Sequence, residues 1–549
     1  MELLTLYALS LATVLLLIWF HKHGVVVRAT SGDQIKHIIK KPLPPGPWTL
    51  PIIGSVHHVM RGLGHRTMVA LSRRHGDLMF LRLGEVPTLV VSSAEAAELV
   101  MKTHDLAFCS RPTTSVTIDI VGCKGQGLGF APYGDRWRQM KKIVVMELLC
   151  AAQVKRIESI RAEEAGRLLR SIAAAAAGAG DGGVVNISEV VKALAPDLVA
   201  RAMFGGMCAE KSEFVVQYDE VSKRVSGFFP VDLFPSSRLV RWLSIGERRL
   251  VRSYGRIQRI IDTVIESRKA AKKNGACSPD QGDLLGVMIR LQEEGSLTFP
   301  LTSEIIGAVM FDIFGGATTT IGSTLEWAMS ELMKKPEAML KAQQEVRKVL
   351  GGSRGVITNA DLVGLSYLRM VIKEVLVNAF AISRDPRYWN NPEDFNPERF
   401  ENSNIDYKGT NFEFTPFGAG RRQCPAIMFG TSTFEIALAN LLFHFDWVLP
   451  DGVSPELVDM SEKYGMGKNI DRTQKNIQAT IDQEMERGKE LVVLHEPTSH
   501  SQLGLLRHRA DEALLRSTFS EERDRCLEWW SSKKMQQRKS SVGLVRKRC

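Results

Sequence analysis

The setting of one cysteine, Cys424, restricts this chain more than any other feature. It follows a glycine-rich turn in the string Phe417-Gly-Ala-Gly-Arg-Arg-Gln-Cys-Pro-Ala, and an apolar run that predicts a helix begins at Ile427. Glycines let a backbone approach a flat ligand closely, and a helix that begins beside a sulfur favours its thiolate form. Arg422 can bind a carboxylate bidentately. A thiolate held in this way suits the fifth coordination position of a haem iron, whereas a buried cysteine in a tight turn is the plainer alternative.

The same string resembles the haem-binding loop of cytochromes P450, whose pattern is F-x-x-G-x-R-x-C-x-G. The defining positions are occupied by Phe417, Gly420, Arg422 and Cys424. Only the last position departs, with Ala426 in place of glycine. The resemblance implies haem b as the cofactor, Cys424 as the axial ligand of its iron, and the other three residues as parts of the haem-binding loop.

Bulk composition fits a large membrane-tethered enzyme. The chain has 549 residues, of which 44% are hydrophobic, enough for one large domain or two to three ordinary ones. Eight cysteines lack paired spacing, so we predict neither a disulfide framework nor a zinc site. A net charge of +10 suits an acidic partner or anionic lipid. Basic residues are dispersed and no base-reading motif is present, which argues against nucleic-acid binding.

The first 20 residues predict a membrane signal anchor. Leu3–Phe20 is apolar apart from three hydroxyl residues, and its length of about 18 residues just reaches that needed to span a bilayer. Basic residues follow the apolar stretch, which places the rest of the chain in the cytosol. A cleaved signal peptide is the alternative, but neither a basic leader nor a small-residue cleavage site is evident.

Residues 21–54 predict a basic, proline-rich hinge. Four prolines fall between Pro42 and Pro47, and such a segment is stiff, extended and unable to form helix. The string is an ordinary linker in the plain interpretation, yet it closely resembles the hinge of plant microsomal P450s of the A-type branch. That resemblance implies a single-pass protein of the endoplasmic reticulum membrane, with a cytosolic catalytic domain that we place at residues 55–466.

A second part of the haem site is predicted in the helix that opens at Tyr133. Trp137 and Lys141 lie one turn apart and share a face. An indole N–H and a cation can together bind one carboxylate, although a surface Trp–Lys pair explains the spacing more simply. In the P450 pattern W-R-x-x-R both positions contact the haem edge and hold propionates. Here Lys141 replaces the arginine, which keeps the charge but loses the fork geometry.

Residues 301–335 predict one long helix with an unusual centre. Thr302 and Glu304 suit its start, but the central Gly-Gly-Ala-Thr-Thr-Thr of 315–320 is poor in helix formers. The glycines indicate either a helix-packing contact or a groove over a haem. The segment resembles the oxygen-binding helix of P450s, which makes Thr320 the catalytic proton-relay hydroxyl. Thr319 then takes a position where the family has an acid, and a hydroxyl cannot supply a titrating carboxylate.

The first departure from the family follows Leu376. The family pattern K-E-x-x-R-L-H-P begins at Lys373, but its arginine is missing and Val377 onward matches a later part of the family. The skipped segment carries that arginine and two strands of the distal pocket wall. Glu374 and Arg399 are expected to be its structural partners. Loss of one member of such a buried network costs roughly 3–5 kcal/mol, and a whole domain is stable by only about 5–15 kcal/mol.

The second departure is the stretch of residues 467–549. The family ends in a short hairpin that reaches the substrate pocket, whereas this stretch is highly charged and contains no motif that we can assign. An internal deletion near residues 376–377 together with such a tail indicates a splicing variant, an error of gene annotation or a decaying gene copy. A regulatory tail is the remaining alternative.

The resemblance predicts a fold that is mainly α with a small β subdomain, behind one N-terminal membrane helix. It implies a haem-thiolate monooxygenase that receives electrons from NADPH–cytochrome P450 reductase. One atom of O2 enters an apolar small molecule, and family analogy places plant terpenoids first. Two alternatives stay open: a non-catalytic, truncated or mis-spliced P450 with impaired haem binding, and a haem-thiolate isomerase or dehydratase that does not use O2.

Overall fold

The computed structural model describes residues 43–112, 115–177, 184–205, 210–225, 229–275, 282–352, 355–376, 381–449, 453–458, 460, 462–463, 469–470 and 476–481. The predicted anchor at 1–20, most of the hinge and the residues after Ile481 lie outside this range. The predicted deletion point at 376–377 falls at the end of one described stretch.

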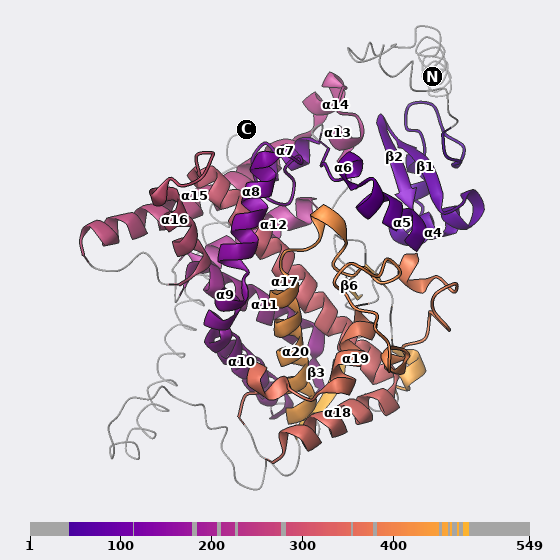
Figure 1. Ribbon diagram of the computed structural model, residues 1–549, viewed down its shortest axis with the longest axis vertical. Coiled ribbons are helices and arrows are strands. Elements are labelled where there is room, and N and C mark those ends of the chain that lie inside the picture. The colour runs from indigo at the N-terminus through magenta and orange to yellow at the C-terminus, as the bar shows by residue number, and fades with distance from the viewer. Residues whose placement is uncertain are drawn as a thin grey trace, which may run out of the picture. The chain divides into compact units, whose positions relative to one another are not determined.

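Helices make up most of the described chain (Figure 1). The longer ones are α4 (Gly64–His75), α8 (Asp135–Ile143), α10 (Glu158–Ala177), α11 (Ile187–Phe204), α12 (Lys211–Val225), α15 (Ile245–Lys273), α16 (Leu284–Glu294), α17 (Ser303–Lys334), α18 (Pro336–Leu350), α19 (Ser366–Val375) and α20 (Ile427–His444). The shorter ones are α3 (Val56–Val59), α5 (Ala94–Glu98), α6 (Asp105–Phe108), α7 (Val116–Val121), α9 (Ala151–Arg156), α13 (Pro230–Leu233) and α14 (Arg238–Leu243). Two π-helical turns, Leu99–Thr103 and Val144–Leu148, extend α5 and α8. Single 3-10 turns lie at Asn359–Leu362, Ile382–Arg384, Pro397–Phe400, Gly420–Arg422 and Pro455–Leu457.

The strands form three small antiparallel sheets. One is the hairpin of β1 (Leu78–Leu83) and β2 (Val86–Val91). A second has the order β3-β7-β4, in which β7 (Asn476–Ile481) pairs with both β3 (Val184–Asn186) and β4 (Phe445–Val448). The third joins β5 (Glu462–Lys463) to β6 (Asn469–Ile470). The prediction of a mainly α protein with small β elements is confirmed, and β7 lies beyond residue 466, where the sequence places the end of the catalytic domain.

Helix α17 is the central element of the described part. Thr302 caps it by accepting a hydrogen bond from the Ile305 amide at 3.4 Å, as the sequence predicts. It packs against α11, α15, α19 and α20, and Lys192 of α11 pairs with its fully buried Glu326 at 2.8 Å. Among the described residues it is the one helix long and apolar enough to cross a membrane, but 67% of its apolar window is buried inside the protein. It is therefore a core helix.

The glycine pair of α17 has two different surroundings. A Cβ added at Gly315 would lie 2.3 Å from the hydroxyl oxygen of Tyr218 on α12, so this glycine allows a helix–helix contact. No atom lies within 4 Å of a Cβ added at Gly316. Despite its poor helix formers, the segment stays helical. The hydroxyls of Thr318 and Thr320 donate to the carbonyls four residues earlier and do not interrupt the helix.

Candidate active site

The loop that carries Cys424 is shaped by its glycines. The Cys424 amide donates to the Phe417 carbonyl at 2.9 Å, which closes the turn. Gly418 and Gly420 have φ values of 68° and 64°, a left-handed conformation that other residues adopt at a cost. A Cβ at Gly420 would also lie 2.1 Å from the Met101 carbonyl oxygen. Gly420 is therefore required both by its conformation and by the close approach of another backbone.

A cavity of about 250 Å³ separates this loop from α17. Cys424, Ala426 and Phe429 line one side, and Ile313, Gly316 and Ala317 of α17 line the other. Trp137, Lys141 and Arg422 also border this cavity. The fold thus brings together residues from three distant motifs that the sequence assigns to one haem site.

The thiol of Cys424 is held in a largely buried position. Burial raises the pKa of the Cys424 thiol, while the nearby Ala426 amide, 3.4 Å from Sγ, and the charge of Lys141 act in the opposite direction. The sequence leads us to expect that the start of α20 favours the thiolate. The amide at the helix start does act in that sense, but in this structure burial outweighs it.

Arg422 is fixed by two backbone carbonyls. Its Nε donates to Cys109 at 2.6 Å and its Nη2 to Ala131 at 2.5 Å, and the guanidinium lies 4.2 Å from the centroid of the Trp137 ring. Its Nη1 is buried and has no acceptor among the residues described. An unsatisfied buried cationic N–H is costly, so this atom fits an anionic group such as a haem propionate.

Trp137 and Lys141 share a face, as predicted, but have other partners here. The indole N–H of Trp137 donates to the Leu128 carbonyl at 3.0 Å. Lys141 Nζ donates to the Arg421 carbonyl at 2.6 Å and lies 5.4 Å from the Trp137 ring centroid. The Lys141 bond holds α8 against the cysteine loop, and the Trp137 bond holds it against the preceding segment at Leu128. That these two side chains also contact a propionate stays a prediction.

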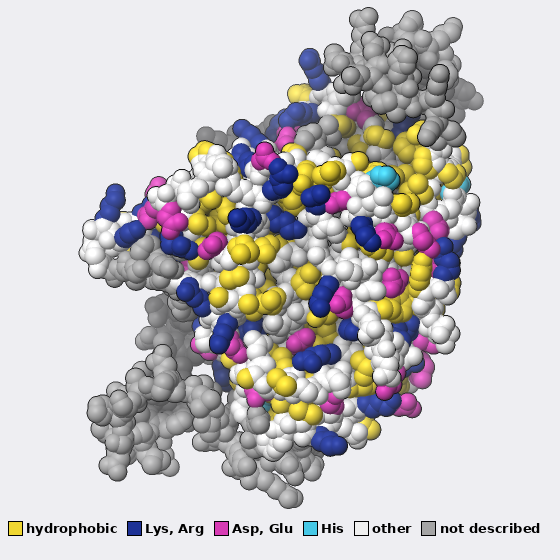
Figure 2. All heavy atoms as spheres, viewed as in Figure 1, with side chains coloured by type: hydrophobic (Ala, Val, Ile, Leu, Met, Phe, Trp, Pro, Cys, Tyr) yellow, Lys and Arg dark blue, Asp and Glu magenta, His cyan; other side chains and the backbone are white. Residues whose placement is uncertain are grey.

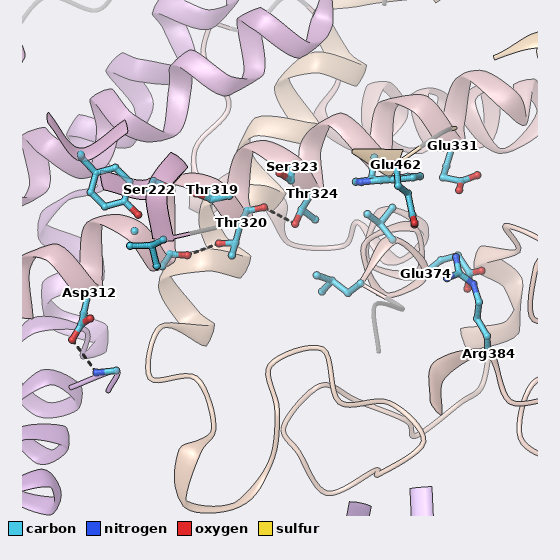
Figure 3. Close-up of a pocket in the computed structure, with 18 of the residues that line it drawn as sticks. Ser222, Asp312, Thr319, Thr320, Ser323, Thr324, Glu331, Glu374, Arg384 and Glu462 are labelled. Atoms are coloured by element: carbon cyan, nitrogen blue, oxygen red, sulfur yellow. Dashed lines mark hydrogen bonds between the residues drawn. The ribbon is translucent and has the colours of Figure 1, made fainter. Parts of the chain in front are cut away.

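Thr320 lies on the wall of a second cavity, of about 520 Å³. Its hydroxyl donates to the Gly316 carbonyl at 2.6 Å, and the Thr324 hydroxyl donates to the Thr320 carbonyl at 2.7 Å. Thr319 lines the same cavity. Figure 3 shows these side chains following α17 along the cavity. The residues common to both cavities are Arg111, Gly129, Asp312 and Gly316. The predicted relay hydroxyl and the predicted iron ligand are therefore found in neighbouring cavities that share part of their walls.

Asp312 is a site residue that sequence reasoning missed. Its Oδ2 accepts hydrogen bonds from the amides of Leu128 and Gly129, at 2.9 and 2.8 Å. A Cβ at Gly127 would lie 2.9 Å from the same oxygen. Burial raises the pKa of Asp312 to about 6, although the two amides oppose the shift. One carboxylate inside the otherwise apolar run of residues 305–314 is the sequence signal that could have found it.

Comparison with known proteins decides the family. The family model of cytochrome P450 matches residues 44–376 and 374–477. The chain is a cytochrome P450. Members of this family bind a haem whose iron is ligated by a cysteine thiolate, act on small molecules with O2 and take electrons from a reductase.

Curated plant P450s resemble this chain over most of their length. The ent-isokaurene C2/C3-hydroxylase of Oryza sativa subsp. japonica is 42% identical over 465 residues, which cover 77% of this P450 and 90% of the relative. The dolabradiene monooxygenase of Zea mays is 41% identical, with 77% and 90% covered. The 5-epiaristolochene 1,3-dihydroxylase of Nicotiana tabacum is 39% identical, with 78% and 90% covered.

The two stretches of this P450 that match the family model meet at Glu374–Leu376. Glu374 Oε1 accepts the Asn396 amide at 3.1 Å, and Arg399 Nε lies 2.9 Å from Glu374 Oε2. The single N–H of Arg399 Nε, however, donates to the Asn396 carbonyl, so Oε2 accepts no hydrogen bond among the described residues. Burial raises the pKa of Glu374 to about 7, against the effect of Arg399. The expected pair is formed, but one oxygen of the carboxylate is not satisfied.

Proposed function

We propose that this P450, with haem bound, is a monooxygenase that inserts one oxygen atom into a terpenoid-like molecule, with Cys424 as the axial ligand of haem b. The observation that carries the proposal is the convergence of Cys424, Arg422 and the Gly316 turn of α17 on one cavity. The names of the relatives, which include a hydroxylase, a monooxygenase and a dihydroxylase, support the reaction class.

The bound haem would supply the O2-activating chemistry, and the residues of the chain would hold the haem and orient the substrate. Arg422 Nη1 is buried without an acceptor in the described structure and would donate to a propionate. The Thr320 hydroxyl donates its hydrogen to the Gly316 carbonyl, so only the lone pairs of Oγ1 remain as acceptors for a group in the cavity. Phe417 and Gly420 would shape the loop around the sulfur.

We further propose attachment to the endoplasmic reticulum membrane through residues 1–20, with NADPH–cytochrome P450 reductase as the electron donor. Exposed apolar side chains support this: Leu43, Trp48 and Ile52 in the described part of the hinge, and Leu239, Trp242 and Leu243 in α14. Glu85 of the β1–β2 turn accepts the Ser236 amide at 3.0 Å and so ties α14 to the hairpin. Figure 2 shows hydrophobic side chains gathered on the face that carries this hairpin. Such a patch suits a lipid surface.

A second candidate function is a non-catalytic P450 with impaired haem binding. The two family matches that overlap at residues 374–376 support it, because a continuous P450 would match in one stretch. The unsatisfied Oε2 of Glu374 also supports it, since the predicted missing arginine would bind there. Glu374 and Leu376 line the larger cavity, at the point where the skipped segment would begin.

The test is the absorption spectrum of the reduced, CO-bound protein in microsomes. Four proteins are compared: the chain as written, the chain with the missing segment reinserted from the rice relative, and Cys424→Ser in each. A thiolate-type Soret band in the chain as written, lost in Cys424→Ser, supports the monooxygenase. A band that appears only after reinsertion supports the non-catalytic alternative. A band that survives Cys424→Ser, or no band in any protein, refutes the assignment of the ligand.

A further inference from the structure

The α17 wall of the larger cavity is lined by hydrogen-bond acceptors. The polar residues of this helix on the wall, besides Trp327 with its indole N–H donor, are Asp312, Thr319, Thr320, Ser323, Thr324 and Glu331. Figure 3 shows them in this order along the helix. The hydroxyl hydrogens of Thr320 and Thr324 are donated to the helix backbone, which leaves only their oxygen lone pairs for a ligand. At Asp312, Thr320 and Thr324 a ligand is therefore stabilised by donating hydrogen bonds, not by accepting them.

The side chains around Asp312 are mainly apolar. The cavity that Asp312 lines is also lined by Val121, Phe130, Val225 and Phe311, together with the polar Arg111 and Ser222. The ring of Phe311 lies 5.0 Å from that of Tyr218, which fixes both rings in the wall. A molecule that fits here needs an apolar skeleton and a donor group on one side. A pure hydrocarbon would leave Oδ1 of Asp312 without a hydrogen-bond partner.

Asp312 is a carboxylate acceptor whose position is fixed by backbone amides. Two backbone amides bind Oδ2, whereas Oδ1 makes no hydrogen bond in the part of the chain that the structure describes. A Cβ at Gly129 would lie 3.1 Å from Oδ1, so the glycine keeps the backbone close against the carboxylate. A charged acceptor in a fixed position gives a short, strong hydrogen bond with a hydroxyl.

Asp312 lies between the larger cavity and the cavity that contains the predicted iron ligand. Asp312 lines both cavities, including the one that contains Cys424. Glu331, the carboxylate at the other end of the wall, is 19 positions further along α17, which is about 28 Å at about 1.5 Å per residue. A ligand of terpenoid size cannot bind both. Bound at Asp312, it lies beside Gly316 and next to the cysteine cavity.

We propose that the substrate is already oxygenated: an apolar, terpenoid-sized skeleton with a hydroxyl group that donates a hydrogen bond to Oδ1 of Asp312. This inference rests on the proposed function and specifies its substrate class. The reaction that supplies the substrate is then one that introduces a hydroxyl group into a terpene hydrocarbon. The name of the 1,3-dihydroxylase relative describes an enzyme that hydroxylates one molecule at two positions, which is compatible with a hydroxylated molecule in such a cavity.

Equilibrium dialysis of the purified full-length chain tests the ligand. The probes are 5-epiaristolochene, its 1-hydroxy and 3-hydroxy derivatives, and the methyl ethers of both alcohols. At pH 8, one alcohol is expected to bind about tenfold more tightly than the hydrocarbon, and its methyl ether, which accepts but cannot donate, loses that gain. Equal binding of the hydrocarbon and both alcohols, an ether that keeps the gain, or no binding of any probe overturns the proposal.

Variants test the residue. Asp312→Asn keeps the shape and an oxygen for the two amides, but turns an N–H₂ group toward the cavity, which donates to alcohol and ether alike. The preference for alcohol over ether is expected to fall from about tenfold to within about twofold. Glu331→Gln, a carboxylate change on the same wall, should keep the preference, and circular dichroism checks that both variants fold. Loss of the preference in Glu331→Gln but not in Asp312→Asn would show that Glu331, and not Asp312, binds the hydroxyl group, which overturns the proposal. Dialysis requires neither haem nor electrons, so its outcome is independent of the CO spectrum.

Discussion

Replacement of Gly420 by alanine is expected to destabilise the cysteine loop far more than the same change at Gly418. The two glycines have nearly the same φ, 64° and 68°, so the conformational penalty, roughly 1–2 kcal/mol, applies to both. In each case alanine also restricts the unfolded chain, and this offsets about 0.4–1 kcal/mol of the penalty. Conformation alone therefore predicts a small and equal loss, about 1 kcal/mol, for either variant.

The surroundings of the two glycines differ. A Cβ at Gly418 meets no atom within 4 Å, whereas a Cβ at Gly420 would lie 2.1 Å from the Met101 carbonyl oxygen. That contact is with backbone and cannot be relieved by a side-chain rotation. The loop must move, and this movement strains the Arg421–Asp105 pair at 3.1 Å and the two carbonyl bonds of Arg422. Loss of two such bonds adds about 2–3 kcal/mol.

Urea unfolding of the full-length chain, followed by tryptophan fluorescence, measures the difference. Gly420→Ala should lower the free energy of unfolding by about 3–4 kcal/mol, and Gly418→Ala by about 1 kcal/mol. Equal midpoints for the two variants would show that the close approach to Met101 does not constrain the loop. That result would refute the steric part of the reasoning while leaving the conformational part intact.

Three further changes have expected outcomes. Burial lowers the pKa of His444 to about 4, so the unfolded chain binds a proton at a higher pH than the folded one. The free energy of unfolding should therefore fall by up to about 3 kcal/mol as the pH falls from about 6.5 through about 4. In acid-unfolding curves, His444→Phe should reduce this pH dependence. Lys192→Met removes an ion-pair partner of the buried Glu326 and should cost about 3 kcal/mol in urea unfolding, whereas the double change with Glu326→Met should recover most of it. Arg422→Lys loses the guanidinium contact with the Trp137 ring and one of the carbonyl bonds. In the chain with the missing segment reinserted, this variant should retain less haem per polypeptide in the pyridine haemochrome assay. An unchanged haem content would show that Arg422 makes no propionate contact.

Features set by local sequence were predictable. The start of α17 follows from the Thr302 cap, and the shared face of Trp137 and Lys141 follows from their spacing in α8. The tight turn before Cys424 follows from its glycines. In each case the physical cause lies within a few residues of the effect, so a short string contains enough information.

Features set by distant contacts were not predictable. Asp312 is bound by amides that are more than 180 positions away in sequence, and no local sequence pattern predicts such a bond. The same holds for the raised pKa of Cys424, because burial depends on elements packed around the loop. The bond of Lys141 to the Arg421 carbonyl likewise depends on how α8 meets the cysteine loop.

The pairing of β7 between β3 and β4 has a consequence for biosynthesis. The sheet cannot close during translation until residue 481 has left the ribosome, although β3 is made roughly 290 residues earlier. The edge of β3 lacks its neighbour throughout that interval, and the edge of β4 lacks it from residue 448 until β7 is made. Unpaired edges invite association with other chains. A message that terminates before codon 476 would yield a polypeptide with both edges permanently open, so we expect it to be held by chaperones and degraded.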